Sequence, residues 1–271
     1  MALPNVNITL GNGSLGGSQA TSDGVVGLIL TGTAVTDGLQ LNTAYVLGSA
    51  NDLTTLGVTS ENNPLVYKDV MAFYTKAGDG AELHLYVVAA TTTYQVMAGI
   101  LSTSPLSVLL DSAGARIKLV GLNKLPSSSY EADDTNEIDK DVILGAEAAQ
   151  ATLESYAGKI MPARCLIGAS FFTGNTDNLY KPAEASYNRV GLVLASDDSE
   201  NYTAAIGQLL GRAAAVDPQI SIARVSDGSL ATEGWLTSGD TQLSKVSIAE
   251  ILHDAGYIFY VTYPTKTGVY L

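Results

Sequence analysis

The chain has 271 residues, 46% of them hydrophobic, so it is long enough to bury a substantial core and too apolar to stay disordered over most of its length. With 27 Asp and Glu against 14 Lys and Arg, its formal net charge is −13, which disfavours nucleic acid and anionic membranes as partners because clustered cations bind both. The single cysteine, Cys165, excludes an internal disulfide, and no signal peptide or membrane-spanning run is visible, so we expect synthesis in a reducing, intracellular compartment.

Residues 1–22 predict an extended arm rather than part of a core. Val6, Ile8 and Leu10 alternate with polar residues, as in a strand that buries one face. The glycine-rich residues 11–17 have little side-chain surface to pack and form a flexible joint. We therefore expect the arm to leave its own domain and join a neighbouring subunit, where Val6, Ile8 and Leu10 would fix its register.

From residue 23 onward, strand and helix patterns alternate in one core domain, residues 23–271. The predicted strands are 25–30, 44–47, 83–88, 117–120, 164–170, 190–195, 220–225 and 257–261. The predicted helices run from Asn63-Pro64 to Tyr74 and over 94–110, 142–158, 198–215 and 241–253, the last with Gly256 as its C-cap. This alternation predicts an α/β fold with a mixed, mainly parallel sheet and helices on both faces, plus the N-terminal arm.

An acidic linker at about 123–141 interrupts the pattern. It carries six acidic residues between Glu131 and Asp141. These could bind Ca²⁺, but the central glycine and the fixed spacing of an EF-hand loop are missing. The favoured interpretation is a solvated linker that also places negative charge at the N-terminus of the next helix. The end of the chain, 268–271, is strand-like, and we expect it to pair with a neighbour or to continue in a longer protein.

No catalytic or cofactor motif is complete. Gly11, Gly13 and Gly16 match the G-x-G-x-x-G spacing of dinucleotide-binding loops, but no helix follows to hold the pyrophosphate. No Walker A motif occurs in the sequence. Ser170 begins like a nucleophile elbow, but Phe172 replaces the final glycine, so we interpret Ser170 as the exposed end of a strand.

The two histidines point to structural roles. His84 lies within a predicted strand, and His253 lies in the last turn of a predicted helix, where an imidazolium interacts favourably with the helix dipole. With the buried-looking Cys165 they make a poor zinc set. We therefore expect no enzymatic activity, no cofactor and no bound metal.

Several segments, in the same order along the chain, resemble a family of contractile phage tail sheath-like proteins found in Bacteroidetes prophages. The matching segments are 2–10 with the glycine joint, 23–30, Asn62-Asn63-Pro64 leading to Phe73-Tyr74, 210–214 continuing through 222–228, 256–259, Tyr263-Pro264 and 268–270. Each match is short, and their common order carries the resemblance.

The resemblance implies a structural subunit without enzymatic activity. Sheath subunits form hexameric rings that stack helically around a tail tube, and contraction drives the tube through a target envelope. Terminal arms join the subunits by adding strands to neighbouring sheets. The implied partners are other copies of the chain, the tail tube protein and the baseplate. The implied location is the bacterial cytoplasm during assembly, then a virion tail or other contractile particle. Family members usually continue into a C-terminal domain after the 268–270 region, and this sequence is expected to depart from the family in lacking it.

Two alternatives stay open. One is a small-ligand-binding enzyme on a doubly wound α/β fold, which the missing set of acids, bases and glycine loops disfavours. The other is a different structural subunit of a phage or secretion system. A tube subunit is the less favoured form of this alternative, because it would be mostly β.

We expect nucleotides, NAD and divalent cations to leave the melting temperature unchanged in a thermal shift assay. A ligand that binds only the native state raises the apparent stability, so a clear rise with any of them would favour the enzyme instead.

Overall fold

The computed structural model describes residues 25–127, 130–133, 136–172, 174–199, 203–217, 220–237 and 248–271. Its centre is a six-stranded sheet with the strand order β2-β3-β1-β4-β5-β6. The strands are β1 (Val26–Gly32), β2 (Ala44–Leu47), β3 (Leu83–Ala89), β4 (Leu119–Asn123), β5 (Arg164–Gly168) and β6 (Val190–Val193). Neighbouring strands are parallel except β2 and β3, which are antiparallel. The predicted mixed, mainly parallel sheet is therefore confirmed.

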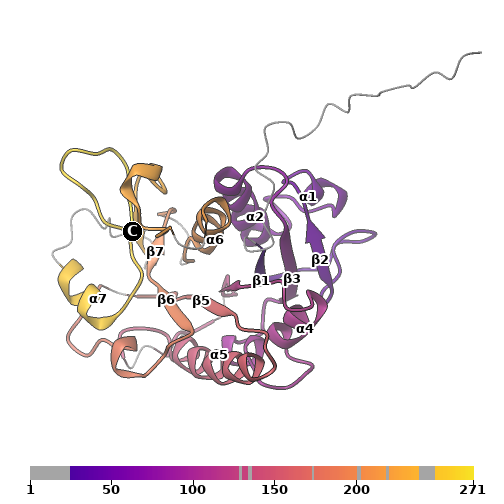
Figure 1. Ribbon diagram of the computed structural model, residues 1–271, viewed down its shortest axis with the longest axis horizontal. Helices are drawn as coiled ribbons and strands as arrows, with labels where there is room; N and C mark the ends of the chain where they lie inside the picture. The colour runs from indigo at the N-terminus through magenta and orange to yellow at the C-terminus, as the bar shows by residue number, and fades with distance from the viewer. Residues whose placement is uncertain are drawn as a thin grey trace, which may run out of the picture.

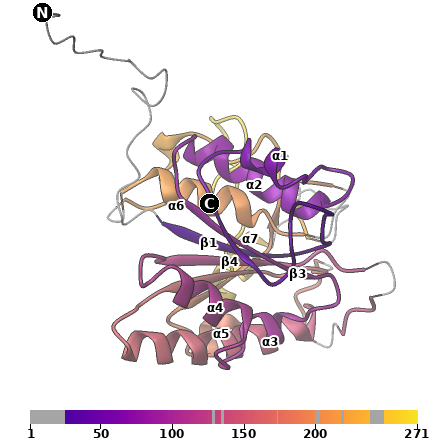
Figure 2. The same ribbon diagram turned by 90° about the vertical axis from the view of Figure 1, so that its right-hand side faces the viewer.

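Helices cover both faces of the sheet, as predicted (Figure 1). The helices are α1 (Asp52–Thr55), α2 (Pro64–Ala77), α3 (Tyr94–Met97), α4 (Pro105–Ser112), α5 (Lys140–Gly158), α6 (Ile206–Ala215) and α7 (Ala249–Ala255), with 3-10 turns η1 (Pro182–Glu184) and η2 (Val225–Asp227). Figure 2 shows α1, α2 and α6 on one face and α3, α4 and α5 on the other. Because both faces are covered, β1 and β3 are buried along almost their whole length.

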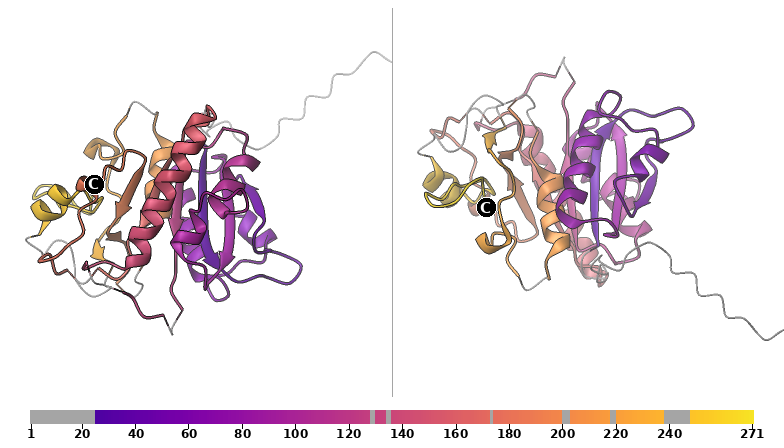
Figure 3. Two further views of the ribbon diagram at one scale, coloured as in Figure 1. Left: turned by 90° about the horizontal axis from the view of Figure 1, so that it is seen from below. Right: turned by 90° about the horizontal axis from the view of Figure 1, so that it is seen from above.

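A second, two-stranded antiparallel sheet of β7 (Ala195–Ser196) and β8 (Trp235–Leu236) lies beyond β6. The views in Figure 3 show this part of the chain beside the main layers, with the long α5 crossing one face of the sheet. No helix among the described residues is both long and apolar enough to cross a membrane.

Glycines let α2 and α6 pack with backbone against backbone. A Cβ at Gly207 would overlap the carbonyl of Asp69, and a Cβ at Gly211 would overlap the carbonyl of Phe73. On the side facing the sheet, a Cβ at Gly121 of β4 would overlap the side chain of Ile206. The two helices and the central strand are therefore closer than ordinary side chains allow.

Two predicted helices have different bounds. The helix expected at 94–110 is two short helices, because Pro105 has no amide N–H to continue a helix and instead starts α4. The helix expected from Asp198 begins only at Ile206. Before it, the amide of Ala205 donates to the carbonyl of Ala195 at 2.8 Å, which holds the chain beside β7.

The predicted strand at 220–225 is wrong. The segment forms a turn in which the amide of Arg224 donates to the carbonyl of Ser221, and it then enters η2. These local hydrogen bonds replace those of a sheet. The predicted strand at 117–120 starts later, as β4.

The two C-terminal segments pair within the chain. The expected strand at 257–261 makes a single parallel bridge, Ile258 to Val193 of β6. Val269 and Tyr270 form antiparallel bridges to Ala231 and Val261. The end of the chain therefore pairs with its own domain, where pairing with a neighbour was one of the two expectations. In α7, Gly256 adopts the left-handed conformation expected of a C-cap, while 241–247 lie outside the described residues.

The close approach of α2 and α6 predicts that Gly207→Ala lowers the free energy of unfolding by about 1–3 kcal/mol, the usual cost of forcing atoms into a packed core. The matched control is Gly158→Ala, because nothing lies within 4 Å of a Cβ at this helical glycine. The control should keep or slightly raise stability. Equal effects of the two changes in urea titrations would contradict the backbone contact.

Candidate functional site

The carboxyl ends of the parallel strands, where α/β proteins usually bind ligands, are filled by the chain's own polar side chains. Asn123 ends β4 and is fully buried. Its Nδ2 donates to Asp69 Oδ2 at 2.8 Å and to the carbonyl of Ala204 at 2.7 Å. Asp69 also accepts from the amide of Gly207 at 3.4 Å, in the first turn of α6. The side-chain amide of Asn123 therefore joins the sheet to α2 and to the residues just before α6.

Asp69 is a buried carboxyl that titrates near neutrality. Burial raises its pKa from 3.8 to about 7, while the hydrogen bond from Asn123 and the charge of Lys68 act in the opposite direction. The neighbouring Asp197 raises the pKa further. The native state therefore retains a proton at a pH where the unfolded chain has lost it.

A second set of polar contacts ties β7 to the same two helices. Lys68 of α2 pairs with Asp197 at 2.9 Å and with Asp198 at 3.6 Å. Asp197 also accepts from Gln208 Nε2 of α6 at 2.5 Å, and the buried Tyr260 hydroxyl donates to Gln208 Oε1 at 2.9 Å. These contacts are internal, so they fix the second sheet against α2 and α6.

Lys124, the residue after β4, is buried by the acidic linker. Its Nζ lies 2.5 Å from Asp141 Oδ2 and 4.2 Å from the centre of the Tyr130 ring. The Tyr130 hydroxyl donates to Asp139. The linker therefore folds over the end of the central strand instead of extending into solvent.

This geometry confirms one part of the linker interpretation and corrects another. Asp139 caps α5 by accepting from the amide of Asp141 at 3.2 Å, so negative charge does stand at the N-terminus of the helix. However, Asp139 is buried and Asp141 is largely so, because both are partners of buried groups. The solvated part is confined to residues such as Glu131 and Asp133, which are exposed.

The residues considered for catalysis do not come together. Ser170 is fully buried rather than the exposed end of a strand, because the chain turns inward after β5. Cys165 is buried, and burial raises the pKa of its thiol. His84 lies in β3 with its Nε2 2.7 Å from Glu82, and His253 lies in the last turn of α7. Within the described ranges, no three His, Cys, Asp or Glu side chains are grouped to hold a metal.

The predicted arm residues Val6, Ile8 and Leu10, and the glycine motif of Gly11, Gly13 and Gly16, lie outside the described residues. What the structure adds is an edge that could receive an arm. β2 ends the sheet, and no strand of the described chain pairs with its outer side. Its Val46 side chain is 61% exposed. Sequence reasoning had identified the strand but not its position at the edge.

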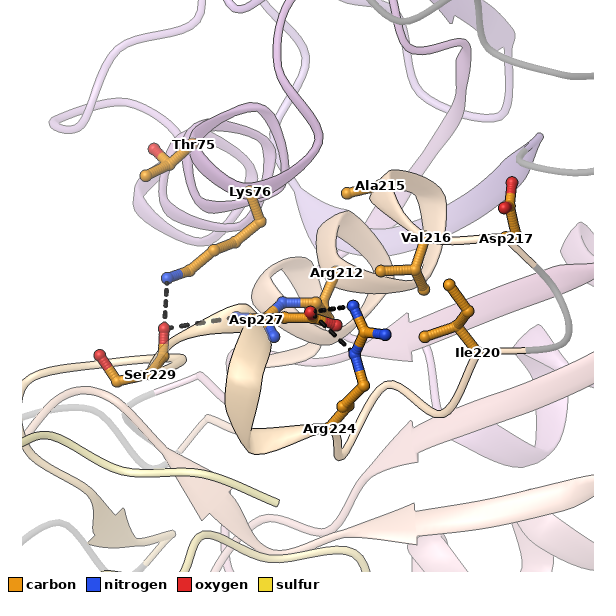
Figure 4. A pocket seen from close by; sticks show the side chains of 10 residues that line it. All are labelled: Thr75, Lys76, Arg212, Ala215, Val216, Asp217, Ile220, Arg224, Asp227 and Ser229. Carbon is orange, nitrogen blue, oxygen red and sulfur yellow. Dashed lines mark hydrogen bonds and ion pairs between the residues drawn. The ribbon is translucent and has the colours of Figure 1, made fainter. Parts of the chain in front are cut away.

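A polar cavity of about 590 Å³ opens where α2 and α6 end (Figure 4). Lys76 donates to the carbonyl of Ser229 at 3.1 Å, and Arg212 donates to the carbonyl of Gly228 at 3.0 Å. Arg224 forms an ion pair with Asp227 across the same cavity. No motif signalled this site, because its residues come from α2, α6 and the loop at 220–229.

The buried Asp69 predicts a pH-dependent stability. The Asp69 carboxyl should contribute a loss of stability as pH rises from about 4 to about 7, where the unfolded state releases the proton that the native state keeps. The free energy of unfolding of Asp69→Asn, minus that of the wild type, should therefore rise by roughly 1 kcal/mol per pH unit across this window and level off above it.

Asp177→Asn, which removes an exposed carboxyl instead of a buried one, is the matched control. Urea titrations at stepped pH measure both. A flat difference for Asp69→Asn would show that its carboxyl titrates normally in the native state.

Comparison with solved structures places this fold among known ones. The structure is similar to the helical sheath of the anti-feeding prophage in its contracted state, solved by cryo-electron microscopy. The TM-score is 0.54 at 13% sequence identity, and the match covers 100% of this chain and 67% of that one. At this identity the similarity concerns the fold. The expected sheath-like fold is thus supported, while the narrower relation to Bacteroidetes prophages stays a prediction.

A comparison with curated proteins finds no match. A family model does match, over residues 3–271, and it describes the N-terminal domain of DUF2586. The chain therefore belongs to the DUF2586 family.

Proposed function

We propose that this chain is a structural subunit of a contractile tail sheath, in which copies form stacked six-membered rings around a tail tube. The observation that carries the proposal is the similarity of the whole chain to a contracted helical sheath. The order of the sheath-like sequence segments supports it independently. The partners would be other copies, the tube protein and the baseplate, first in the bacterial cytoplasm and then in the finished particle.

The core has the properties that such a subunit needs. A sheath subunit moves as a body during contraction, so its domain must keep its shape while its contacts with neighbours change. Here the layers are joined by backbone contacts at Gly207 and Gly211 and by the buried amide of Asn123. Core packing of this kind resists continuous deformation. The moving connections would then lie outside it.

The arm is the proposed connection. A strand with Val6, Ile8 and Leu10 on one face gains main-chain hydrogen bonds from an open sheet edge, and pockets for these side chains fix its register. The outer side of β2 is one such edge, although its four residues make it short. The glycines at 11–17 supply the reach.

The first test deletes residues 1–20 from the full-length protein. If the arm lies outside the core of its own domain, as proposed, the melting temperature should stay within a few degrees of the wild type, while cylinders in negative-stain electron micrographs should disappear. If the deletion instead unfolds the domain, the arm is an ordinary core strand.

The alternation of the arm offers a sharper variant with its own control. Val6→Asp with Ile8→Asp places charge on the face that would enter a neighbour's sheet, so cylinders should be lost. Asn5→Asp with Asn7→Asp places the same charge on the opposite face, so cylinders should form. Equal behaviour of the two pairs would contradict one-sided insertion.

A further inference from the structure

The cations of this acidic chain gather at one end of the molecule. A second cavity, of about 560 Å³, adjoins the one in Figure 4 and shares Val216, Asp217 and Ile220 with it. Together the two form a groove, here called the amino-end groove because it lies where β4, β5 and β6 begin. Its cationic lining is Lys76, Lys118, Arg164, Arg189, Arg212 and Arg224. These are six of the 14 Lys and Arg in the chain, against two carboxylates, Asp217 and Asp227.

Most cations of the groove form no ion pair with a carboxylate among the described residues. Most described Lys and Arg outside the groove do form one. Outside the groove, five of the seven described Lys and Arg pair with acids, Lys159 and Lys266 being the exceptions; the five are Lys68, Arg116, Lys124, Lys140 and Lys181. Inside it, only Arg224 forms an ion pair within the described part of the chain. Lys76 and Lys118 donate to carbonyls, and the Nε of Arg189 is buried without a hydrogen-bond partner.

Helix ends explain only part of this distribution. Lys76 and Arg212 stand in the last turns of α2 and α6, where cations interact favourably with the helix dipole. Burial and the charge of Arg212 nevertheless lower the pKa of Lys76. Lys118, Arg164 and Arg189 stand at the starts of strands, where no dipole requires them. Their accumulation favours an anionic partner.

The opposite end of the sheet carries more exposed carboxylates than cations, although Lys140 pairs there with Asp133 at 3.6 Å. Glu131 and Asp133 are exposed after the carboxyl end of β4, and Asp177 is exposed after β5. The two loops meet where Asn175 Nδ2 donates to Glu137 Oε1 at 2.9 Å. These residues, Glu131, Asp133, Glu137 and Asp177, are here called the carboxyl-end patch. Because parallel strands share one direction, the groove and the patch lie at opposite ends of the same layer.

We propose that the amino-end groove binds the carboxyl-end patch of a second copy of this chain, so that copies associate head to tail. The proposal rests on the proposed function, which requires self-assembly. A contact between two different surfaces of identical subunits generates rings or helices rather than closed dimers, as a sheath demands. Six cations also give the contact a direction, because two grooves or two patches repel each other.

A charge-swap experiment on the full-length chain tests this contact. The groove variant is Lys118→Glu with Arg164→Glu, and the patch variant is Glu131→Lys with Asp177→Lys; all four side chains are exposed. Each variant alone sets two reversed charges against unchanged charges of the same sign on the other surface, so its self-association in sedimentation velocity should weaken at least about tenfold. An equimolar mixture restores both contacts in an alternating order and should recover association.

Two controls separate charge position from total charge. Lys181→Glu with Lys266→Glu changes the net charge as the groove variant does, at exposed sites outside the groove, and should associate like the wild type. Raising NaCl from about 50 mM to about 500 mM should weaken wild-type association, because salt screens exposed charges. Melting temperatures of all variants confirm that they fold.

Several results would overturn the inference: a groove variant that associates normally, a mixture that is no better than its components, or a wild-type chain that stays monomeric at low salt. A monomer that is stabilised by millimolar inorganic phosphate would identify the groove as a small-anion site instead. Different results would contradict the groove contact and the proposed sheath function. Cylinders formed by the groove variant would refute the groove contact alone, whereas a wild-type chain that forms none would contradict the function itself.

Discussion

The side-chain amide of Asn123 is the contact on which the arrangement of this domain depends. Two glycines bring α2 and α6 together so closely that their backbones touch, and this proximity leaves polar groups without access to water. Asn123 supplies the missing partners by donating to Asp69 and to the carbonyl of Ala204. A buried polar group without a partner costs about 1–3 kcal/mol, so the close helix pair and the amide require each other. The second sheet is then attached through Lys68 and Gln208 of the same helices.

The two ends of the sheet differ in what they present. At the carboxyl end, where α/β enzymes usually hold a ligand, Lys124 and Asn123 are occupied by Asp141, Asp69 and the linker that folds over them. At the amino end, two cavities are lined by six cations, of which only Arg224 forms an ion pair within the described part of the chain. Among the described residues, the usual ligand end is therefore covered by an acidic linker, and the cavities lined by cations lie at the opposite end. A molecule with two unlike ends is suited to polymerisation in one direction.

Much of the fold follows from local pattern. The runs at 25–30 and 83–88 are strands because continuous apolar sequence fits a position covered on both faces. The helix from Pro64 and the C-cap at Gly256 follow from the stereochemistry of proline and glycine. The errors have a shared cause. At 203–205 and 220–225, contacts with distant residues or turn hydrogen bonds determine the backbone, and neither leaves a periodic signature.

The site was harder to predict than the fold. Arg164 and Lys118 are unremarkable in sequence, and only the register of β4 and β5 brings them to one end of the sheet, in a cavity that Arg189 also lines. The acidic linker was visible, but its role as a cover for Lys124 was not, because that depends on Tyr130 and on the end of β4. The distribution of charge over a surface is a property of the folded chain. Composition alone therefore revealed the excess of acidic residues, but not the separation of cations and carboxylates between the two ends of the sheet.

The proposed function unites a closely packed core, a sheath-like fold and two ends of unlike charge in a subunit that joins its own copies. Electron microscopy of the full-length protein at low ionic strength tests this most directly. The account predicts hollow cylinders built of stacked rings, each with six-fold symmetry and a central lumen. Isolated particles of one or two subunits at every concentration would contradict it.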